Sequence, residues 1–439
     1  MTKDCDFLIY AEFIVTANNN DEQIRNGCIA VKDNTIVYAG KAEKIENIWK
    51  AKKDIKLGNA ILLPGLFNSH THVPMTLLRG VADDLPLMDW LVNHIFPVEA
   101  QLTTELITLG SMIGCAEMIA SGTVGFLDGY MYEDRVGKVA EQAGIKCVLG
   151  EGFFEFPSPF FKTPQEAWET IRSQHEMFKE SDLVQTSVAP HSVYTTTPEQ
   201  LEESFELASE LGILWQTHCA ESESETAMTL EKYKVRPIEL LKRHGLLSPR
   251  TRLHHCVETT DEEIDILAES GTRISHNPQS NLKLGSGICP LKKHLDAGTG
   301  VGIGTDGAAS NNDLDMFEEL RTAALLQKGY LKDPTAIPAS TALSLATSGS
   351  AENLGFNDSG KIEAGMKADI IAVDAKRPHM MPIFNPMSHL VYSAKGTDVI
   401  FSMCNGKILY EHGQHTTLDM DIISREAIKA TKWVEKHLP

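Results

Sequence analysis

The chain has 439 residues, of which 42% are hydrophobic and 23% charged, enough for a large core and compatible with a barrel plus an appended module. Its net charge of −20 argues against nonspecific binding to nucleic acid or anionic membranes, and no apolar run of about 18 residues predicts a transmembrane helix. The eight cysteines are scattered without a C-x-x-C pair, and Met1–Asp6 shows no signal-peptide pattern. We therefore expect a cytoplasmic protein with reduced thiols that binds neither nucleic acid nor membrane. We also expect the protein to form a homo-oligomer.

Short strands are expected in the first 60 residues. Strand-forming residues cluster at Phe7–Tyr10, Cys28–Val31 and Thr35–Tyr38. Asp33 and Asn34 supply a turn between the last two segments. Residues 1–60 therefore predict part of a small β domain.

From residue 61 to about 360, strand-like and helix-like segments alternate. The expected strands are Ile61–Leu66, Thr123–Asp128, Lys146–Gly150, Val184–Pro190, Ile213–Cys219, Arg252–Val257, Arg273–His276 and Val301–Thr305. The expected helices include Glu105–Ala120, Pro198–Leu211, Asp261–Ser270 and Leu314–Leu326. Thr197 and Thr260 each precede a helix with a capping-box partner three residues on. Eight such alternations predict an α/β protein with a TIM-like (β/α)8 barrel over residues 61–360.

The last part of the chain becomes strand-like again. Asp369–Val373, Val399–Met403 and Lys407–Tyr410 are expected strands, with the hairpin signal Asn405-Gly406 before the third. Ser424–His437 is expected to be a helix. Because neither end of the chain has many strands alone, we expect residues 1–60 and 361–439 to form one β-sandwich domain, with the helix at its end.

Polar residues that can bind a metal fall at the ends of the expected barrel strands. They are His70 and His72 after the first strand, His191 after the fourth, His218 with Glu221 after the fifth, His255 at the sixth and Asp306 at the eighth. Residues two apart in a strand point the same way, so His70 and His72 can share one ion. The carboxyl ends of barrel strands form a single rim, where active sites lie. These residues predict a catalytic divalent metal, with Glu221 placed as general acid/base.

Motifs for other kinds of chemistry are incomplete, misplaced or absent in this chain. Gly302–Gly307 matches G-x-G-x-x-G, but it lies at the last barrel strand and contains Asp306, whereas a dinucleotide fingerprint should open an early βαβ unit. His175-Glu176 lacks the second histidine of H-E-x-x-H. The H-x-E and P-C-x-x-C pattern of the cytidine-deaminase type is absent as well.

Several stretches resemble signatures of a known superfamily. Pro64–His72, Gly304–Gly307 and Gly360–Asp369 resemble the opening, strand-8 and re-entry segments of the amidohydrolases. Within that superfamily the chain is most similar to the 5-methylthioadenosine/S-adenosylhomocysteine deaminases. The matching stretches are His72–Gly80, Asp83–Trp90, Ser275–Pro278, Ser280–Leu284 and Thr305–Asn312. The resemblance covers nearly the whole chain.

The resemblance implies a role for each residue. The metal ligands, usually of zinc, would be His70, His72, His218 and Asp306. Glu221 would protonate the purine N1, His255 would orient or polarise the water at the metal, and Asp306 would share its proton. The substrate would meet Trp90, Glu99, His191 and Glu221, with Trp90 flanking the ligand and Glu99 meeting the ribose hydroxyls.

The number of metals follows from a missing lysine. A second metal in this superfamily usually needs a carbamylated lysine at the end of strand 4. Residues 182–197 contain no lysine. We therefore expect one divalent ion per chain, most simply Zn²⁺.

The implied activity is hydrolytic deamination of a 6-aminopurine nucleoside: 5′-methylthioadenosine, S-adenosylhomocysteine, adenosine or 5′-deoxyadenosine. Some members place an arginine after strand 3 to meet the homocysteine carboxylate, but this chain has Glu151 with Phe153, Phe154 and Phe156. Small or apolar 5′ groups would suit these aromatics better. The alternatives are an aminohydrolase or chlorohydrolase acting on guanine, a pterin or an s-triazine, and a non-catalytic metal-binding barrel.

Overall fold

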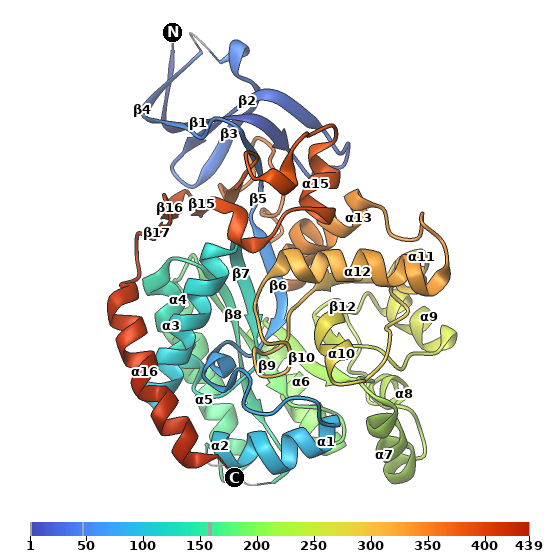
Figure 1. Ribbon diagram of the computed structural model, residues 1–439. Coiled ribbons are helices and arrows are strands. Elements are labelled where there is room, and N and C mark those ends of the chain that lie inside the picture. Colours follow the sequence, from blue (N-terminus) through green and yellow to red (C-terminus); the bar gives the residue numbers. More distant parts are fainter. Residues whose placement is uncertain (1, 46–47, 157–159, 439) are drawn as a thin grey trace.

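Eight parallel strands form a barrel in the middle of the chain, and both ends of the chain build a second sheet beside it (Figure 1). The computed structural model describes residues 2–45, 48–156 and 160–438. The expected α/β barrel with an additional sheet from the two termini is confirmed. The division of the chain at residues 60 and 360 stays a prediction.

The barrel strands follow one another around the ring in chain order. They are β6 (Leu66–Thr71), β7 (Thr123–Asp128), β8 (Lys146–Phe153), β9 (Val184–Pro190), β10 (Leu214–Cys219), β11 (Thr251–His255), β12 (Arg273–His276) and β13 (Gly300–Ile303). Hydrogen bonds join β6, the first barrel strand, to the residues that directly follow β13, the last one. Thr305 donates its N–H to Asn68 Oδ1 at 3.0 Å, and Asp306 donates its N–H to the carbonyl of His70 at 2.9 Å. The ring therefore joins beside two of the expected metal ligands.

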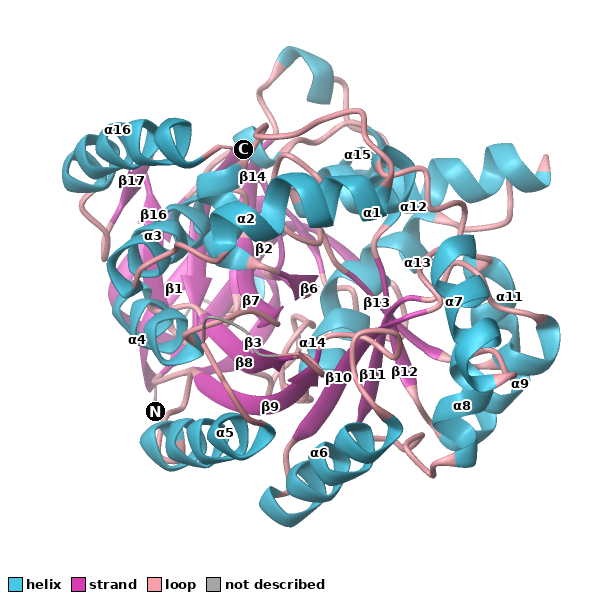
Figure 2. Ribbon diagram, turned by 90° about the horizontal axis from the view of Figure 1, so that it is seen from below, coloured by secondary structure: helices cyan, strands magenta, loops and turns pink. Residues whose placement is uncertain are grey.

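Helices surround the strands, as Figure 2 shows. They are α3 (Thr104–Ala120), α4 (Glu133–Ala143), α5 (Pro164–Phe178), α6 (Pro198–Leu211), α7 (Glu223–Tyr233), α8 (Pro237–Arg243), α9 (Asp261–Ser270), α10 (Pro278–Lys283), α11 (Leu291–Ala297), α12 (Met316–Leu331), α13 (Ala339–Ser344) and α14 (Ser350–Leu354). The expected capping boxes at Thr197 and Thr260 are confirmed. Each satisfies backbone N–H groups at a helix start that the helix itself leaves free.

The first barrel strand was wrongly predicted as Ile61–Leu66. That apolar run belongs to two strands in two sheets: β5 (Ala60–Pro64) lies in the terminal sheet and β6 begins at Leu66. The chain changes sheets at Gly65, where a Cβ atom would lie 2.3 Å from Val124 Cγ2. Only glycine fits there, and its hydrogen bond to the carbonyl of Asp369 holds the crossing in place.

The terminal sheet contains the remaining strands. They are β1 (Lys3–Val15), β2 (Gln23–Lys32), β3 (Thr35–Lys41), β4 (Trp49–Lys56), β5, β14 (Ile370–Asp374), β15 (Val399–Cys404), β16 (Lys407–Glu411) and β17 (Gln414–His415). Ile9 and Ile29 from the N-terminal part pack in one core with Ile370 and Phe401 from the C-terminal part. The strands far apart in sequence therefore form a single hydrophobic unit.

A buried ion pair joins the terminal sheet to the barrel. Lys146, at the start of β8, contacts Asp369, and the two side chains are 2% and 0% exposed. Asp369 also accepts hydrogen bonds from Ser359 Oγ and the N–H of Asn405, both at 2.7 Å. These donors compensate for the burial of the carboxylate.

Helical segments also lie outside the regular barrel pattern, among them α15 (Pro386–Tyr392) between β14 and β15. The C-terminal helix α16 (Met420–His437) runs beside α3 on the barrel (Figure 1). The segment after β6 forms α1 (Leu87–Asp89), the π-helical η3 (Trp90–Ile95) and α2 (Phe96–Glu99), which lie at one end of the barrel (Figure 2). Within the described residues no single helix is long and apolar enough to span a membrane. The helical segments Leu87–Glu99 and Thr104–Ala120 together have the length and apolar composition of such a span, but they are bent by 118° relative to one another.

Candidate metal centre and substrate cavity

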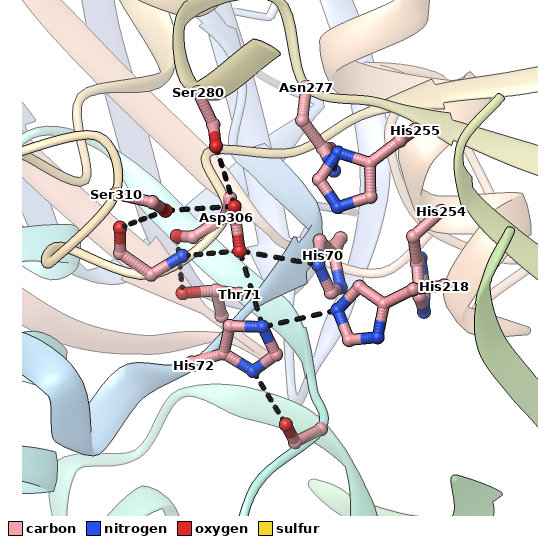
Figure 3. A network of polar contacts seen from close by, with 12 residues as sticks. His70, Thr71, His72, His218, His254, His255, Asn277, Ser280, Asp306 and Ser310 are labelled. Atoms are coloured by element: carbon pink, nitrogen blue, oxygen red, sulfur yellow. Dashed lines mark hydrogen bonds and ion pairs between the residues drawn. The ribbon is translucent and has the colours of Figure 1, made fainter. Parts of the chain in front are cut away.

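The four expected metal ligands lie together at the carboxyl end of the barrel. His70 Nε2 and His72 Nε2 are 3.4 Å and 3.2 Å from Asp306 Oδ1. His72 Nε2 is also 3.3 Å from His218 Nε2, and Figure 3 shows these side chains facing one another. One ligand atom from each of His70, His72 and His218 lies within 4.8 Å of the others. Such spacing permits one ion to contact all of them.

Backbone carbonyls orient two of these imidazoles. His72 Nδ1 lies 2.6 Å from the carbonyl oxygen of Gly129, and His218 Nδ1 lies 2.5 Å from that of His191. A carbonyl oxygen can only accept, so each Nδ1 carries the hydrogen and each Nε2 presents its lone pair to the centre.

The chemistry of this donor set fits a divalent metal. Both ring nitrogens of His70 are buried without a hydrogen-bond partner among the described residues. Such a group costs free energy unless something binds it. Three imidazoles and a carboxylate are suitable ligands for zinc. A metal at this position would bind His70 Nε2, which lies 3.4 Å from Asp306 Oδ1 but makes no hydrogen bond among the described residues.

Asp306 is held rigidly in its ionised form. Its Oδ2 accepts hydrogen bonds from Ser280 Oγ at 2.6 Å and Ser310 Oγ at 2.8 Å, and Oδ1 accepts the N–H of Gly307 at 2.8 Å. Burial opposes ionisation, but the neighbouring imidazoles of His70 and His72 hold the pKa of Asp306 well below its ordinary value. The carboxylate is therefore available as a ligand at neutral pH.

Glu221 is the carboxyl group that faces the centre. Its Oε2 lies 3.9 Å from His255 Nε2, and burial raises the pKa of Glu221 above its ordinary value. Glu223 is exposed. Glu225 instead accepts the backbone N–H groups of Ala220 and Glu221, at 3.1 Å and 2.6 Å. Of these three acidic residues at the helix start, Glu221 is the one that lines the cavity.

All the predicted site residues line one cavity. It has a volume of about 860 Å³ including its open mouth. The predicted residues in its wall are His70, His72, Trp90, Glu99, His191, His218, Glu221, His255 and Asp306. Among the described residues that line it there is no lysine or arginine. The structure brings the set together, and the role of each residue stays a prediction.

The helical segment after β6 forms one wall of this cavity. Trp90 is buried, and its Nε1–H has no hydrogen-bond partner in the described part of the chain. Glu99 is 8% exposed and accepts a hydrogen bond from Tyr130 Oη. On the opposite strand ends, His191 Nδ1 lies 2.9 Å from Thr195 Oγ1 and its ring centre is 4.8 Å from that of Phe154. The cavity therefore combines aromatic surfaces with separate polar groups.

Several cavity residues were not predicted from the sequence. The ring of His254 stacks on His70 at 3.8 Å between centres, and His254 Nε2 lies 2.9 Å from Gln216 Oε1. His254 pairs with His218 in the parallel register of β10 and β11, which is a signal that a strand alignment could have supplied. The sequence gives no indication that Tyr130 contacts Glu99, because that contact depends on how the segment after β6 folds.

Comparison with known proteins identifies the family. A model of the amidohydrolase family matches residues 61–409, which include the whole barrel and every site residue named above. The chain belongs to the amidohydrolase family. The matched range includes the barrel-rim histidines and Asp306, whose roles as metal ligands stay a prediction.

Individual amidohydrolases match nearly the whole chain. It is 47% identical over 433 residues to a 5-methylthioadenosine/S-adenosylhomocysteine deaminase of Nitratidesulfovibrio vulgaris, covering 99% of this chain and 98% of that protein. It is 42% identical to a 5′-deoxyadenosine deaminase of Methanothermobacter thermautotrophicus, covering 90% and 92%. The crystal structure of an adenosine deaminase from Xanthomonas campestris with bound zinc is 35% identical, with a TM-score of 0.97 over 99% of this chain and 100% of that one.

Proposed function

We propose that this protein is a hydrolase that removes ammonia from a 6-aminopurine nucleoside. The observation that carries the proposal is the position of Glu221 and His255 beside the cluster of His70, His72, His218 and Asp306, in a cavity that also contains Trp90 and Glu99. The names of the related deaminases support the same reaction.

We propose that His70, His72, His218 and Asp306 hold one divalent ion, Zn²⁺. The zinc in the related adenosine deaminase structure supports this identity, and the absence of a lysine at the end of β9 supports the single ion. A bound divalent ion lowers the pKa of a water ligand to roughly 7 and so supplies a nucleophile at neutral pH.

The protein's own groups would then move the protons. Glu221 would take a proton from the attacking water and deliver it to N1 of the purine as the oxygen adds to C6. The raised pKa of Glu221 favours the protonated form that this delivery needs. Asp306 or Glu221 would pass the remaining water proton to the leaving amine, so that ammonia departs. His255, whose Nδ1 lies 2.8 Å from Asn281 Oδ1, would orient the water.

We further propose a small or apolar 5′ group on the substrate. Phe154 lies in the cavity wall with its ring centre 4.8 Å from that of His191, so this part of the wall is aromatic. The described residues that line the cavity include no lysine or arginine to meet a homocysteine carboxylate. Glu151, near the end of β8, is buried outside the cavity lining, and its oxygens accept the N–H groups of Tyr132 and Glu133. These contacts support 5′-deoxyadenosine, 5′-methylthioadenosine or adenosine over S-adenosylhomocysteine.

A panel of substrates tests the proposal. Zinc-loaded protein is mixed with 5′-methylthioadenosine, S-adenosylhomocysteine, adenosine, 5′-deoxyadenosine, guanine and an s-triazine, and ammonia release is measured directly. We expect the highest kcat/KM among the nucleosides with uncharged 5′ groups. Turnover of guanine or the triazine alone would favour the rival aminohydrolase or chlorohydrolase, and no turnover with metal bound would favour a non-catalytic barrel.

A further inference from the structure

One polar contact in the cavity has no part in the reaction described above. Tyr130 follows β7 and is 6% exposed, and its hydroxyl donates to Glu99 Oε1. The other oxygen, Glu99 Oε2, makes no hydrogen bond within the described part of the chain. Glu99 lies in the cavity wall, so this second oxygen is an acceptor that the protein itself leaves unused.

Backbone hydrogen bonds hold Tyr130 at a fixed place beside the proposed metal ligands. The residue before it, Gly129, accepts the hydrogen bond from His72 Nδ1 at 2.6 Å. Tyr130 itself is fixed by backbone bonds to β8, from its N–H to Gly150 and from Gly152 N–H to its carbonyl, at 3.1 Å and 2.7 Å. Two adjacent residues therefore position a metal ligand and the Glu99 carboxylate.

The unused oxygen calls for a ligand with hydroxyl groups. A buried carboxylate has only acceptor sites, and neutral O–H donors satisfy it without bringing a second charge into the cavity. A vicinal diol supplies two neighbouring donors of this kind to the carboxylate.

We propose that Tyr130 is a positioning residue for recognition of the ribose 2′- and 3′-hydroxyls: it fixes one oxygen of Glu99 so that the other faces the sugar. The proposal rests on the proposed nucleoside deaminase function. Without the phenol hydroxyl, Glu99 can rotate away from the cavity, and each binding event must restore its orientation.

Tyr130→Phe tests the proposal because it removes only the hydroxyl. The zinc-loaded variant and the unmodified protein are compared on adenosine and on 2′,3′-dideoxyadenosine, which share the base and the 5′ group. Binding of the products inosine and 2′,3′-dideoxyinosine is measured by calorimetry as a readout independent of turnover. Tyr194→Phe is the matched control, since Tyr194 lines the same cavity but has no contact with Glu99 among the described residues.

We expect Tyr130→Phe to raise KM for adenosine and the Kd of inosine about tenfold, the scale of a hydrogen bond to a charged group. Values for the dideoxy compounds should stay within about twofold, and Tyr194→Phe should leave the ratio between the two nucleosides unchanged. Equal losses on both nucleosides, or no loss on either, would overturn the role of Tyr130 alone. Failure of the unmodified protein to deaminate any nucleoside would instead overturn the proposed function and this proposal with it.

Discussion

Glu221→Gln is the substitution that most directly tests the chemistry. The amide has nearly the same shape as the carboxyl group, and Glu221 is only 7% exposed, so the packing around it should be preserved. The variant loses the ability to take up and release a proton at Oε2, which lies 3.9 Å from His255 Nε2. Its effect should therefore fall on the chemical step and not on folding.

The expected magnitude follows from the role of a general acid/base. Such a group contributes about 10²- to 10⁴-fold to the rate, which corresponds to about 3 to 5 kcal/mol of the activation free energy. We expect kcat for ammonia release to fall by that factor while KM changes by less than about fivefold, because the cavity wall is unchanged.

The assay measures ammonia directly from zinc-loaded protein at saturating nucleoside, with the Tm of each variant recorded. Glu223→Gln is the matched control: it removes the same charge two residues further on, from a side chain that is exposed. It should keep kcat within about twofold. Full activity of Glu221→Gln, or an equal loss in Glu223→Gln, would refute the assignment of Glu221 as the proton-transfer group.

Three further predictions concern stability, pH and the metal. Lys146→Met leaves the buried Asp369 without its ionic partner and should lower the free energy of unfolding by about 3–5 kcal/mol in urea titrations. Adding Asp369→Asn should recover part of this loss. An unchanged free energy of unfolding in Lys146→Met would contradict the pairing. Burial raises the pKa of Glu151 to about 7 from its ordinary 4.5, so the folded chain holds a proton that the unfolded chain releases between these pH values. The stability advantage of the native protein over Glu151→Gln should therefore decrease as pH rises from about 5 to 8, and a difference that grows with pH would contradict the shift. Chelation should abolish ammonia release and lower Tm, and one equivalent of Zn²⁺ per chain should restore both; a need for two equivalents would contradict a single-ion site.

The meeting of the proposed metal ligands at one rim could be predicted from the sequence because their positions depend on simple periodicity. His70 and His72 are two residues apart, and His218 and Asp306 follow short apolar runs, so a parallel barrel necessarily brings them to one rim. The caps at Thr197 and Thr260 were predictable for a similar reason, since their hydrogen bonds are local. These features need no knowledge of distant contacts.

Features that depend on an unusual backbone or on a distant contact were not predictable. The apolar run at 60–67 gives no sign that the chain changes sheets at Gly65, because both sheets bury apolar residues. His254 and His255 both line the cavity although neighbours in a strand normally point to opposite faces; the positive φ of 73° at His255 ends the strand geometry there. The strand β4 was missed because most of its residues are polar and exposed.

The junction between β6 and β13 has a consequence for how the protein acquires its metal. Asn68 and Thr305, which hold these two strands together, are 237 residues apart in sequence, and His70 and Asp306 lie directly beside them. A chain in which the last strand has not yet docked has only three of the four proposed ligands in place. Contacts so distant in sequence form slowly, so zinc capture should coincide with the final docking of β13 and would serve as a kinetic marker for completion of folding.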